Sequence, residues 1–186
     1  VLAESLTAIR TNLTRIDELV QDYLSLVRVA NIQRQPQDLG AAVQAWVAEM
    51  QTPAAARGVT VQTAGLTTLG QVAFHTGTLR RAVLNLLQNA LEAMSQGGTV
   101  TLEGQGMATH VQLQVRDTGS GMPAARLAQI FEPLYTTKPE WTGLGLYIVQ
   151  EIVTAHEGQI TVESGEGQGT TFTITLPRAG GFIVSK

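Results

Sequence analysis

The sequence predicts an α+β fold: a two-layer α/β sandwich, in which helices cover one face of a mixed, mostly antiparallel sheet, preceded by a long coiled-coil-type helix. Three observations lead to this prediction. A heptad of apolar residues runs through the first thirty residues. Short runs further along alternate apolar and polar residues, as half-buried strands do. Helical and strand-like segments follow one another in mixed order, joined by tight turns.

The N-terminal segment carries the heptad. Its apolar residues are spaced alternately four and three apart, at Leu2, Leu6, Ile9, Leu13, Ile16, Val20, Tyr23 and Val27. So narrow a stripe favours a helix packed along another helix, in a hairpin or between two chains. We therefore expect a homodimer through this helix, while a core helix of the same domain stays open as the alternative.

The rest of the chain predicts one domain and a tail. Pro36 ends the first element, so we expect residues 1–35 to form the helix and linker, residues 36–178 the domain and residues 179–186 a frayed tail. Asp38 is placed to cap the first helix of the domain, which ends before Gly58.

Periodicity and turn residues place the other elements of this domain. Further helices are expected over 76–94, shortly after Pro123, and over 142–156. Expected strands lie around 59–62, 71–74, 100–102, 111–115, 159–163 and 171–176.

Composition excludes several classes of function. A net charge of -3 does not indicate binding to nucleic acid or to anionic lipid. There is no cysteine, and His75, His110 and His156 are too scattered for a zinc site. No segment is apolar for long enough to span a bilayer, and the chain starts without methionine. We expect a cytoplasmic fragment without direct membrane contact, cut from a parent whose anchoring stays open.

Two asparagines stand out in the helix predicted over 76–94. Its buried stripe is expected at Leu79, Val83, Leu86, Leu87, Ala90 and Met94. Asn85 and Asn89, four residues apart, point together from a different face. Asparagine is unfavourable inside a helix, and its amide oxygen is a hard, neutral ligand for Mg²⁺ beside phosphates. Two solvated or capping asparagines remain the alternative.

The sequence DTGSGM begins at Asp117, directly after a predicted strand. Gly119 and Gly121 allow the backbone to approach a ligand closely. A buried carboxylate at this place can accept a hydrogen bond from the exocyclic amine of adenine, whereas guanine would present an acceptor. This residue therefore favours ATP over GTP, although an Asx-type turn with flexible glycines also fits.

The sequence TGLGL, which comprises Thr142, Gly143, Leu144, Gly145 and Leu146, opens the last predicted helix. Free amides and the dipole at a helix N-terminus favour an anion such as a phosphate chain. A simple glycine-rich helix entry is the alternative. No GK[ST] sequence follows, so this is not a Walker motif.

A loop is expected between these two motifs, in the sequence FEPLYTTKP. Its position predicts a lid, with Phe131 as apolar anchor and Lys138 as counter-charge for the terminal phosphate. A solvated surface lysine is the alternative for Lys138.

The motifs NLLQNA, DTGSGM, FEPLYTTK, TGLGL and GQGTTF occur in an order and spacing that resemble the N, glycine and F boxes of sensor histidine kinases of two-component systems. The F box is most similar to that of the nitrogen-regulation type. Residues 36–178 would then be the catalytic ATP-binding domain, of the GHKL superfamily. Residues 1–35 would be the linker and the second helix of the dimerisation and phosphotransfer hairpin.

The resemblance implies ATP and Mg²⁺ as ligands and assigns the site residues. Asn89 would hold Mg²⁺, Asn85 and Lys138 would act on the phosphate side, and Asp117 would bind adenine. The other residues of the pocket would be Gly119, Gly121, Thr142, Gly143, Leu144, Gly145, Leu146, Gly169 and Thr170.

The implied activity is that of a protein-histidine kinase, which donates the γ-phosphate to a histidine upstream of this fragment for relay to the aspartate of a response regulator receiver domain. Hydrolytic relatives such as DNA gyrase carry a glutamate in place of Asn85, and asparagine cannot act as a base. The phosphoacceptor signature is missing, and Trp141 replaces a usual glycine. A catalytically silent nucleotide-sensing or dimerisation module and a GHKL-type ATPase are the alternatives.

Overall fold

The structure is a computed structural model, and it describes residues 32–136, residues 142–178, Val20, Leu24, Val27 and Val29. The four isolated residues are helical. Val20 and Val27 belong to the predicted heptad and are 48% and 55% exposed, so these two positions do not pack into the core of the domain. The other heptad positions and the tail predicted over 179–186 lie outside the described residues.

A five-stranded mixed sheet with the strand order β2-β4-β5-β7-β6 forms one layer of the domain. Its strands are β2 (Val59–Ala64), β4 (Gly98–Gly106), β5 (His110–Asp117), β6 (Gln159–Gly165) and β7 (Gly169–Pro177). β2 and β4 pair in parallel, and all other neighbours in this sheet pair antiparallel. The alternation that predicted strands is visible in β5, where Val111, Leu113 and Val115 are buried and the residues between them are not.

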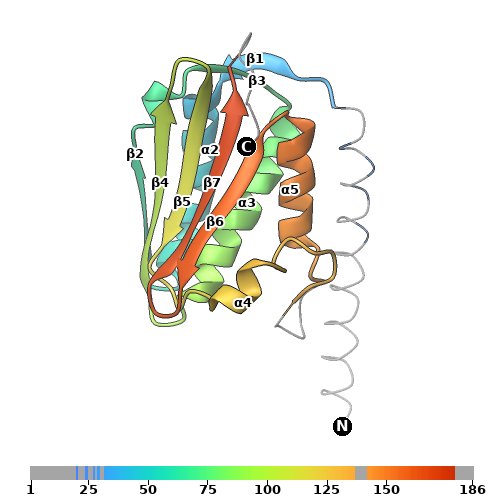
Figure 1. Ribbon diagram of the computed structural model, residues 1–186. Helices are drawn as coiled ribbons and strands as arrows, with labels where there is room; N and C mark the ends of the chain where they lie inside the picture. The colour runs from blue at the N-terminus through green and yellow to red at the C-terminus, as the bar shows by residue number, and fades with distance from the viewer. Residues whose placement is uncertain are drawn as a thin grey trace, which may run out of the picture.

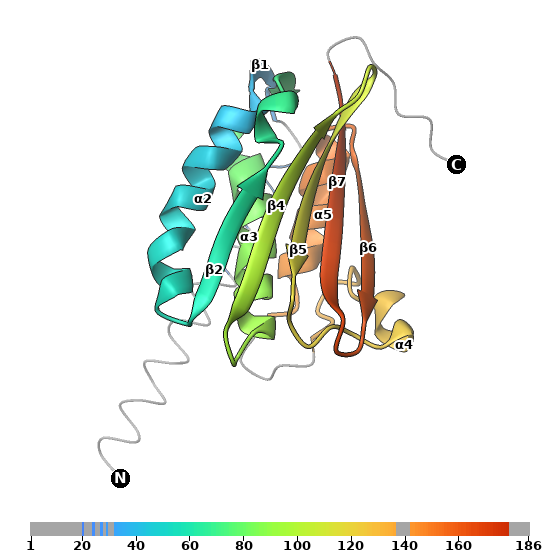
Figure 2. The ribbon, with the colours of Figure 1, turned by 90° about the vertical axis from the view of Figure 1, so that its left-hand side faces the viewer.

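Three helices form the second layer and cover one face of this sheet (Figures 1 and 2). They are α2 (Leu39–Ala55), α3 (Thr76–Ala93) and α5 (Gly145–Ala155). Two short helices, the 3₁₀ helix η1 (Leu66–Thr68) and α4 (Ala124–Leu127), lie in the connections. Within the described ranges, no helix has the length and apolar character needed to cross a membrane. The predicted two-layer α/β sandwich, with helices on one face of a mixed, mostly antiparallel sheet, is confirmed.

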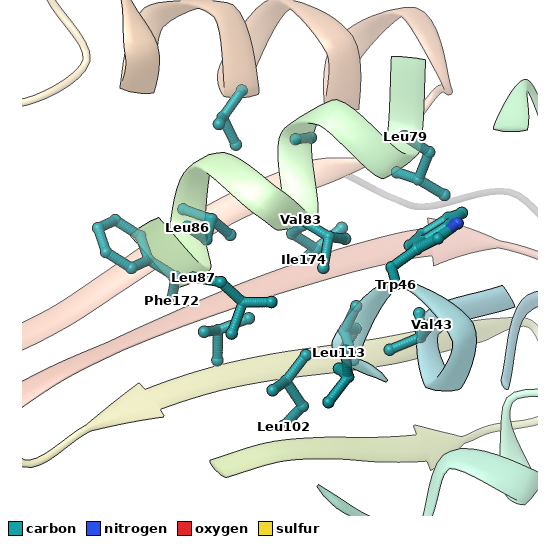
Figure 3. Close-up of a cluster of buried hydrophobic side chains, with 14 of the residues drawn as sticks. Val43, Trp46, Leu79, Val83, Leu86, Leu87, Leu102, Leu113, Phe172 and Ile174 are labelled. Atoms are coloured by element: carbon teal, nitrogen blue, oxygen red, sulfur yellow. The ribbon is translucent and has the colours of Figure 1, made fainter. Parts of the chain in front are cut away.

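The hydrophobic core lies between the two layers, where Trp46 of α2 and Leu79, Val83 and Leu87 of α3 meet sheet residues such as Leu102 (Figure 3). The whole stripe predicted for α3 is buried. Burial of each large apolar side chain stabilises the fold by about 1.5–3 kcal/mol. The predicted cap of α2 is also present, since Asp38 Oδ1 accepts a hydrogen bond from Ala41 N at 2.9 Å.

One strand was not predicted. β1 (Gln35–Asp38) pairs antiparallel with β3 (Gln71–Phe74) in a separate two-stranded sheet. Pro36 lies inside β1, which is possible because an edge strand tolerates a missing donor. This small sheet ties the start of the domain to the segment that leads into α3.

The last helix begins later than predicted, at Gly145 instead of Thr142. Gly143 has a φ of +71°, which no α-helix contains. Thr142 accepts a hydrogen bond from Leu144 N through its Oγ1 at 3.2 Å, in a turn before the helix. The glycine motif is therefore the connection into α5 and not its first turn.

Candidate functional site

A pocket of about 290 Å³ opens where α3, α4, β7 and the start of α5 meet the end of β5. Eight of the residues predicted for the site line it: Asn85, Asn89, Asp117, Gly121, Gly143, Gly145, Leu146 and Thr170. These residues come from the two halves of the domain, so the fold brings together motifs that lie far apart in the sequence. Four other predicted residues lie beside the pocket without lining it: Gly119, Thr142, Leu144 and Gly169.

One wall of the pocket is the polar face of α3. Asn85, Gln88, Asn89, Glu92 and Ala93 line it, while the opposite face of the helix is buried in the core. At about 1.5 Å per residue, the distance from the first to the last of them along the helix is about 12 Å. The side chains are ordered along this wall, because Gln88 Nε2 donates a hydrogen bond to Glu92 Oε1 at 2.8 Å.

Asp117 closes one end of the pocket, and only 4% of the residue is exposed. Its Oδ1 accepts hydrogen bonds from Gly119 N at 2.8 Å and Thr170 N at 3.3 Å. Burial raises the pKa of this carboxyl, and the two backbone hydrogen bonds oppose the rise. Within the described residues no group donates a hydrogen bond to Oδ2, which leaves this oxygen available to a ligand.

Two glycines explain how the backbone approaches so closely around this carboxylate. Gly169 has a φ of +77°, and a Cβ on it would lie 2.0 Å from the carbonyl oxygen of Asp117. Gly121 has a φ of +64°, and its Cβ would lie 1.9 Å from the carbonyl oxygen of Gly165. Any larger residue at either position would push the DTGSGM segment away from the turn between β6 and β7.

The other end of the pocket is formed by the start of α5. Asn85 Nδ2 donates a hydrogen bond to the carbonyl oxygen of Gly145 at 3.4 Å, which joins α3 to α5 at this point. The first amides of α5 have no acceptor within the helix, and Leu146 lines the pocket beside them. Gly143 packs on the backbone of Leu134, since a Cβ there would lie 2.5 Å from the Leu134 carbonyl carbon.

Sequence reasoning missed about half of the lining. The residues not predicted are Gln88, Glu92, Ala93, Ser120, Met122, Arg126, Ile130, Tyr135, Thr136 and Phe172. Gln88 and Glu92 could have been found, because they follow Asn85 by three and seven residues on one helical face. Arg126 and Phe172 carry no motif, so their place depends on the tertiary fold.

The predicted lid lies partly outside the described residues, and Lys138 and Trp141 fall in that part. Phe131, the predicted anchor, packs against the core and contacts Phe172 edge-on, with ring centroids 6.5 Å apart. Leu134 is 67% exposed and has a φ of +66°.

A metal in this pocket would depend on few protein ligands. Among the described residues, no group of three or more histidine, cysteine, aspartate or glutamate side chains is placed to hold a metal ion. The amide of Asn89 suits Mg²⁺, which keeps several waters and usually takes one or two protein ligands together with substrate phosphates. The residues present therefore fit a magnesium ion that arrives with a nucleotide.

The three histidines have structural partners. Nε2 of the buried His156 accepts a hydrogen bond from His75 N at 3.0 Å, and its Nδ1 lies 2.7 Å from the carbonyl oxygen of Ile152. Nδ1 therefore carries the proton, and burial lowers the pKa of this imidazole. His75 caps α3, because its Nδ1 accepts a hydrogen bond from Thr78 N at 3.2 Å. His110 begins β5, with Nδ1 3.1 Å from Thr109 Oγ1.

The layered fold and a pocket with an acceptor at one end and a helix N-terminus at the other define an ATPase-type domain. Residues 75–180 match the family model described as "Histidine kinase-, DNA gyrase B-, and HSP90-like ATPase". This match covers more than half of the chain, and the chain belongs to this family.

Similar proteins are sensor kinases. The chain is 34% identical over 163 residues to the sensor histidine kinase ZraS of Escherichia coli (strain K12), and the match covers 88% of this chain and 35% of ZraS. It is 41% identical over 99 residues to sporulation kinase C of Bacillus subtilis (strain 168), covering 53% of this chain and 23% of that kinase. The chain thus spans about a third or less of these relatives.

A solved structure also has a similar fold. The crystal structure of full-length ShkA in complex with AMPPNP matches with a TM-score of 0.81 at 28% identity, covering 94% of this chain and 38% of that chain. These comparisons confirm the resemblance to sensor histidine kinases that the order of the motifs predicted.

Proposed function

We propose that this chain is the ATP-binding part of a protein-histidine kinase, which binds Mg-ATP and donates its γ-phosphate to a histidine that lies elsewhere in the kinase. The observation that carries the proposal is the pocket itself, where the free oxygen of Asp117 and the amides of Asn85 and Asn89 face one space. Its wall of about 12 Å along α3 suits an extended nucleotide. ShkA, a structural relative, was crystallised with AMPPNP.

Recognition of the base is assigned to Asp117. Because Gly119 and Thr170 occupy Oδ1, Oδ2 is the oxygen that accepts a hydrogen bond from the exocyclic amine of adenine. Guanine has a carbonyl oxygen at that place, and two acceptors would then face each other in a buried site. The pocket therefore selects ATP over GTP.

The phosphates are assigned to the opposite end of the pocket. The segment from Gly143 to Leu146 and the free amides of α5 support them. Asn89 holds Mg²⁺, and Asn85 lines the phosphate side. Gly169 and Thr170 complete the pocket next to Asp117. Lys138 of the predicted lid supplies a positive charge for the terminal phosphate.

Asn85 favours transfer over hydrolysis. Its amide cannot take a proton from water, and its Nδ2 already donates to the Gly145 carbonyl. A neutral imidazole needs no such base: its nitrogen lone pair bonds to the γ-phosphorus while the bond to the bridging oxygen breaks and ADP leaves. Mg²⁺, when bound, neutralises charge on the phosphates.

The phosphate acceptor is assigned to a part of the kinase outside this chain. Both ring nitrogens of the buried His156 are engaged, and His75 uses Nδ1 as a helix cap. From the acceptor histidine the phosphoryl group passes to the aspartate of a response regulator receiver domain. The exposed Val20 and Val27 support a homodimer through the N-terminal helix.

The test is phosphoryl transfer in trans. The chain is mixed with a helical hairpin that carries a histidine followed by an acidic residue, and with γ-labelled ATP and Mg²⁺. We expect acid-labile, base-stable label on the hairpin, and none on the chain alone. Bound ATP without labelled hairpin would favour a nucleotide-sensing module, and steady phosphate release by the chain alone would favour an ATPase.

A further inference from the structure

The charge of the pocket does not match its proposed ligand. The charged side chains among its lining residues are Glu92, Asp117 and Arg126, so the described wall holds two carboxylates and one cation. A triphosphate carries several negative charges, and a site for it needs positive groups besides a metal ion. Arg126 is the one described lining residue able to supply that charge.

Arg126 is held at the pocket by the short helix α4. Met122 N, just before this helix, donates a hydrogen bond to Ser164 Oγ at 2.9 Å. Arg126 N donates to the carbonyl oxygen of Pro123 at 2.9 Å. Together with the close packing of Gly121 on Gly165, the contact of Met122 fixes the start of α4 to the end of β6 and the turn that follows it. The guanidinium therefore extends from an anchored wall and not from the lid.

The guanidinium of Arg126 also forms no ion pair within the part of the chain that the structure describes. Arg34 and Arg80 pair with Glu157 and Glu49, and Arg178 donates to two backbone carbonyls. Arg126 forms no such ion pair, not even with Glu92 in the same pocket, whose Oε1 accepts from Gln88. An arginine without an acidic partner has its full set of donors available for a ligand in the pocket.

We propose that Arg126 is a phosphate-binding residue of this site, whose guanidinium donates hydrogen bonds to the phosphate chain of the bound nucleotide. The inference rests on the proposed function and deepens it. A guanidinium only donates, and its planar fork matches the oxygens of phosphate, so it suits the phosphates better than the acceptor-seeking amine of adenine. Arg126 lines the pocket from α4, which precedes the predicted lid that carries Lys138.

The experiment compares nucleotides that differ only in their phosphates. Calorimetry with Mg²⁺ gives the affinities of adenosine, ADP and ATP for the unchanged chain, Arg126→Ala and Arg126→Lys. For Arg126→Ala we expect adenosine binding within about twofold of the unchanged chain and ATP binding weakened about 10- to 100-fold. Arg126→Lys keeps the charge and loses the fork, so its ATP affinity should lie between the two.

Three further measurements separate this role from others. Arg57→Ala removes an exposed arginine that does not line the pocket, and it should leave ATP affinity unchanged. The salt dependence of ATP affinity should be smaller in Arg126→Ala than in the unchanged chain, because one charge contact is gone. The unfolding temperature of Arg126→Ala should stay the same, since Arg126 is exposed.

Several results would overturn the inference. Unchanged ATP affinity in Arg126→Ala would do so, as would equal losses for adenosine and ATP or a large drop in unfolding temperature. If the unchanged chain bound ATP and Arg126→Ala bound it equally tightly, the proposed function would stand and the inference would fall. If the unchanged chain bound no nucleotide, both would fall.

Discussion

In the proposed function, Asp117 and Asn89 contact different parts of the same ligand. Asp117 accepts a hydrogen bond from the base, and Asn89 holds the Mg²⁺ bound to the phosphates. The Asp117 carboxylate is fixed by two backbone amides and keeps one oxygen for the base. Asn89 offers a neutral amide on the half-buried face of α3 that lines the pocket. Removing either should therefore change binding in distinguishable ways.

Asn89→Ala should weaken ATP binding only when magnesium is present. The amide is assigned to the metal, so its loss should reduce the affinity for Mg-ATP by about 10- to 100-fold and leave metal-free binding nearly unchanged. Calorimetry in Mg²⁺ and in EDTA measures both.

Arg80→Ala serves as a control on the same helix and should leave ATP affinity unchanged, since Arg80 pairs with Glu49 and does not line the pocket. An equal loss in Asn89→Ala with and without the metal would remove Asn89 from the magnesium site.

At the scale of elements, sequence patterns gave α3, its buried stripe and its amide face, because helical periodicity alone decides which residues share a face. They did not give β1, whose residues Gln35–Asp38 show no alternation and form a strand only because β3 lies beside them. The start of α5 was placed three residues early, since the positive φ of Gly143 cannot be read from a glycine-rich stretch.

In the candidate site, too, local sequence patterns predicted some residues, and those placed by tertiary contacts could not be predicted. Asp117, Asn85 and Asn89 stand out in local sequence motifs, and Thr170 is expected from the resemblance to sensor histidine kinases. Arg126 reaches the pocket only through the anchoring of α4 to the β6–β7 turn, and such a tertiary contact leaves no trace in sequence spacing.

Helices α3 and α5, which line the pocket, are joined by His156 at the ends that lie away from it. This contact predicts a pH dependence of stability. His156 ends α5 and accepts a hydrogen bond from the backbone of His75, the cap of α3. Burial lowers its pKa from 6.5, so it stays neutral in the folded state while the unfolded chain protonates first. Its stabilising contribution is complete above pH 6.5 and is lost as the pH falls below that value.

His156→Gln should therefore lower the free energy of unfolding at neutral pH by about 1–3 kcal/mol and flatten its decline in acid. Urea unfolding at a series of pH values measures this, with His110→Gln as the control. A decline in His156→Gln as steep as in the unchanged chain would assign the acid sensitivity to another group.

At the scale of the whole molecule, the exposed Val20 and Val27 predict self-association through the N-terminal helix. We expect the unchanged chain to sediment as a dimer, and the double variant Val20→Asp and Val27→Asp to sediment as a monomer with an unchanged domain. Leu134→Asp is the control, because Leu134 is an exposed apolar residue outside the heptad. A dimer that survives the double substitution would place the interface elsewhere.

At the scale of the whole molecule, the central proposal is that one pocket of one domain distinguishes adenine from guanine and holds the phosphates for transfer. Calorimetry of ATP and GTP binding in Mg²⁺, with the unchanged chain and with Asp117→Ala, tests this claim most directly. We expect ATP to bind at least about 100-fold more tightly than GTP, and Asp117→Ala to lose most of this ATP affinity. Equal affinities for ATP and GTP, or an unchanged ATP affinity in Asp117→Ala, would contradict it.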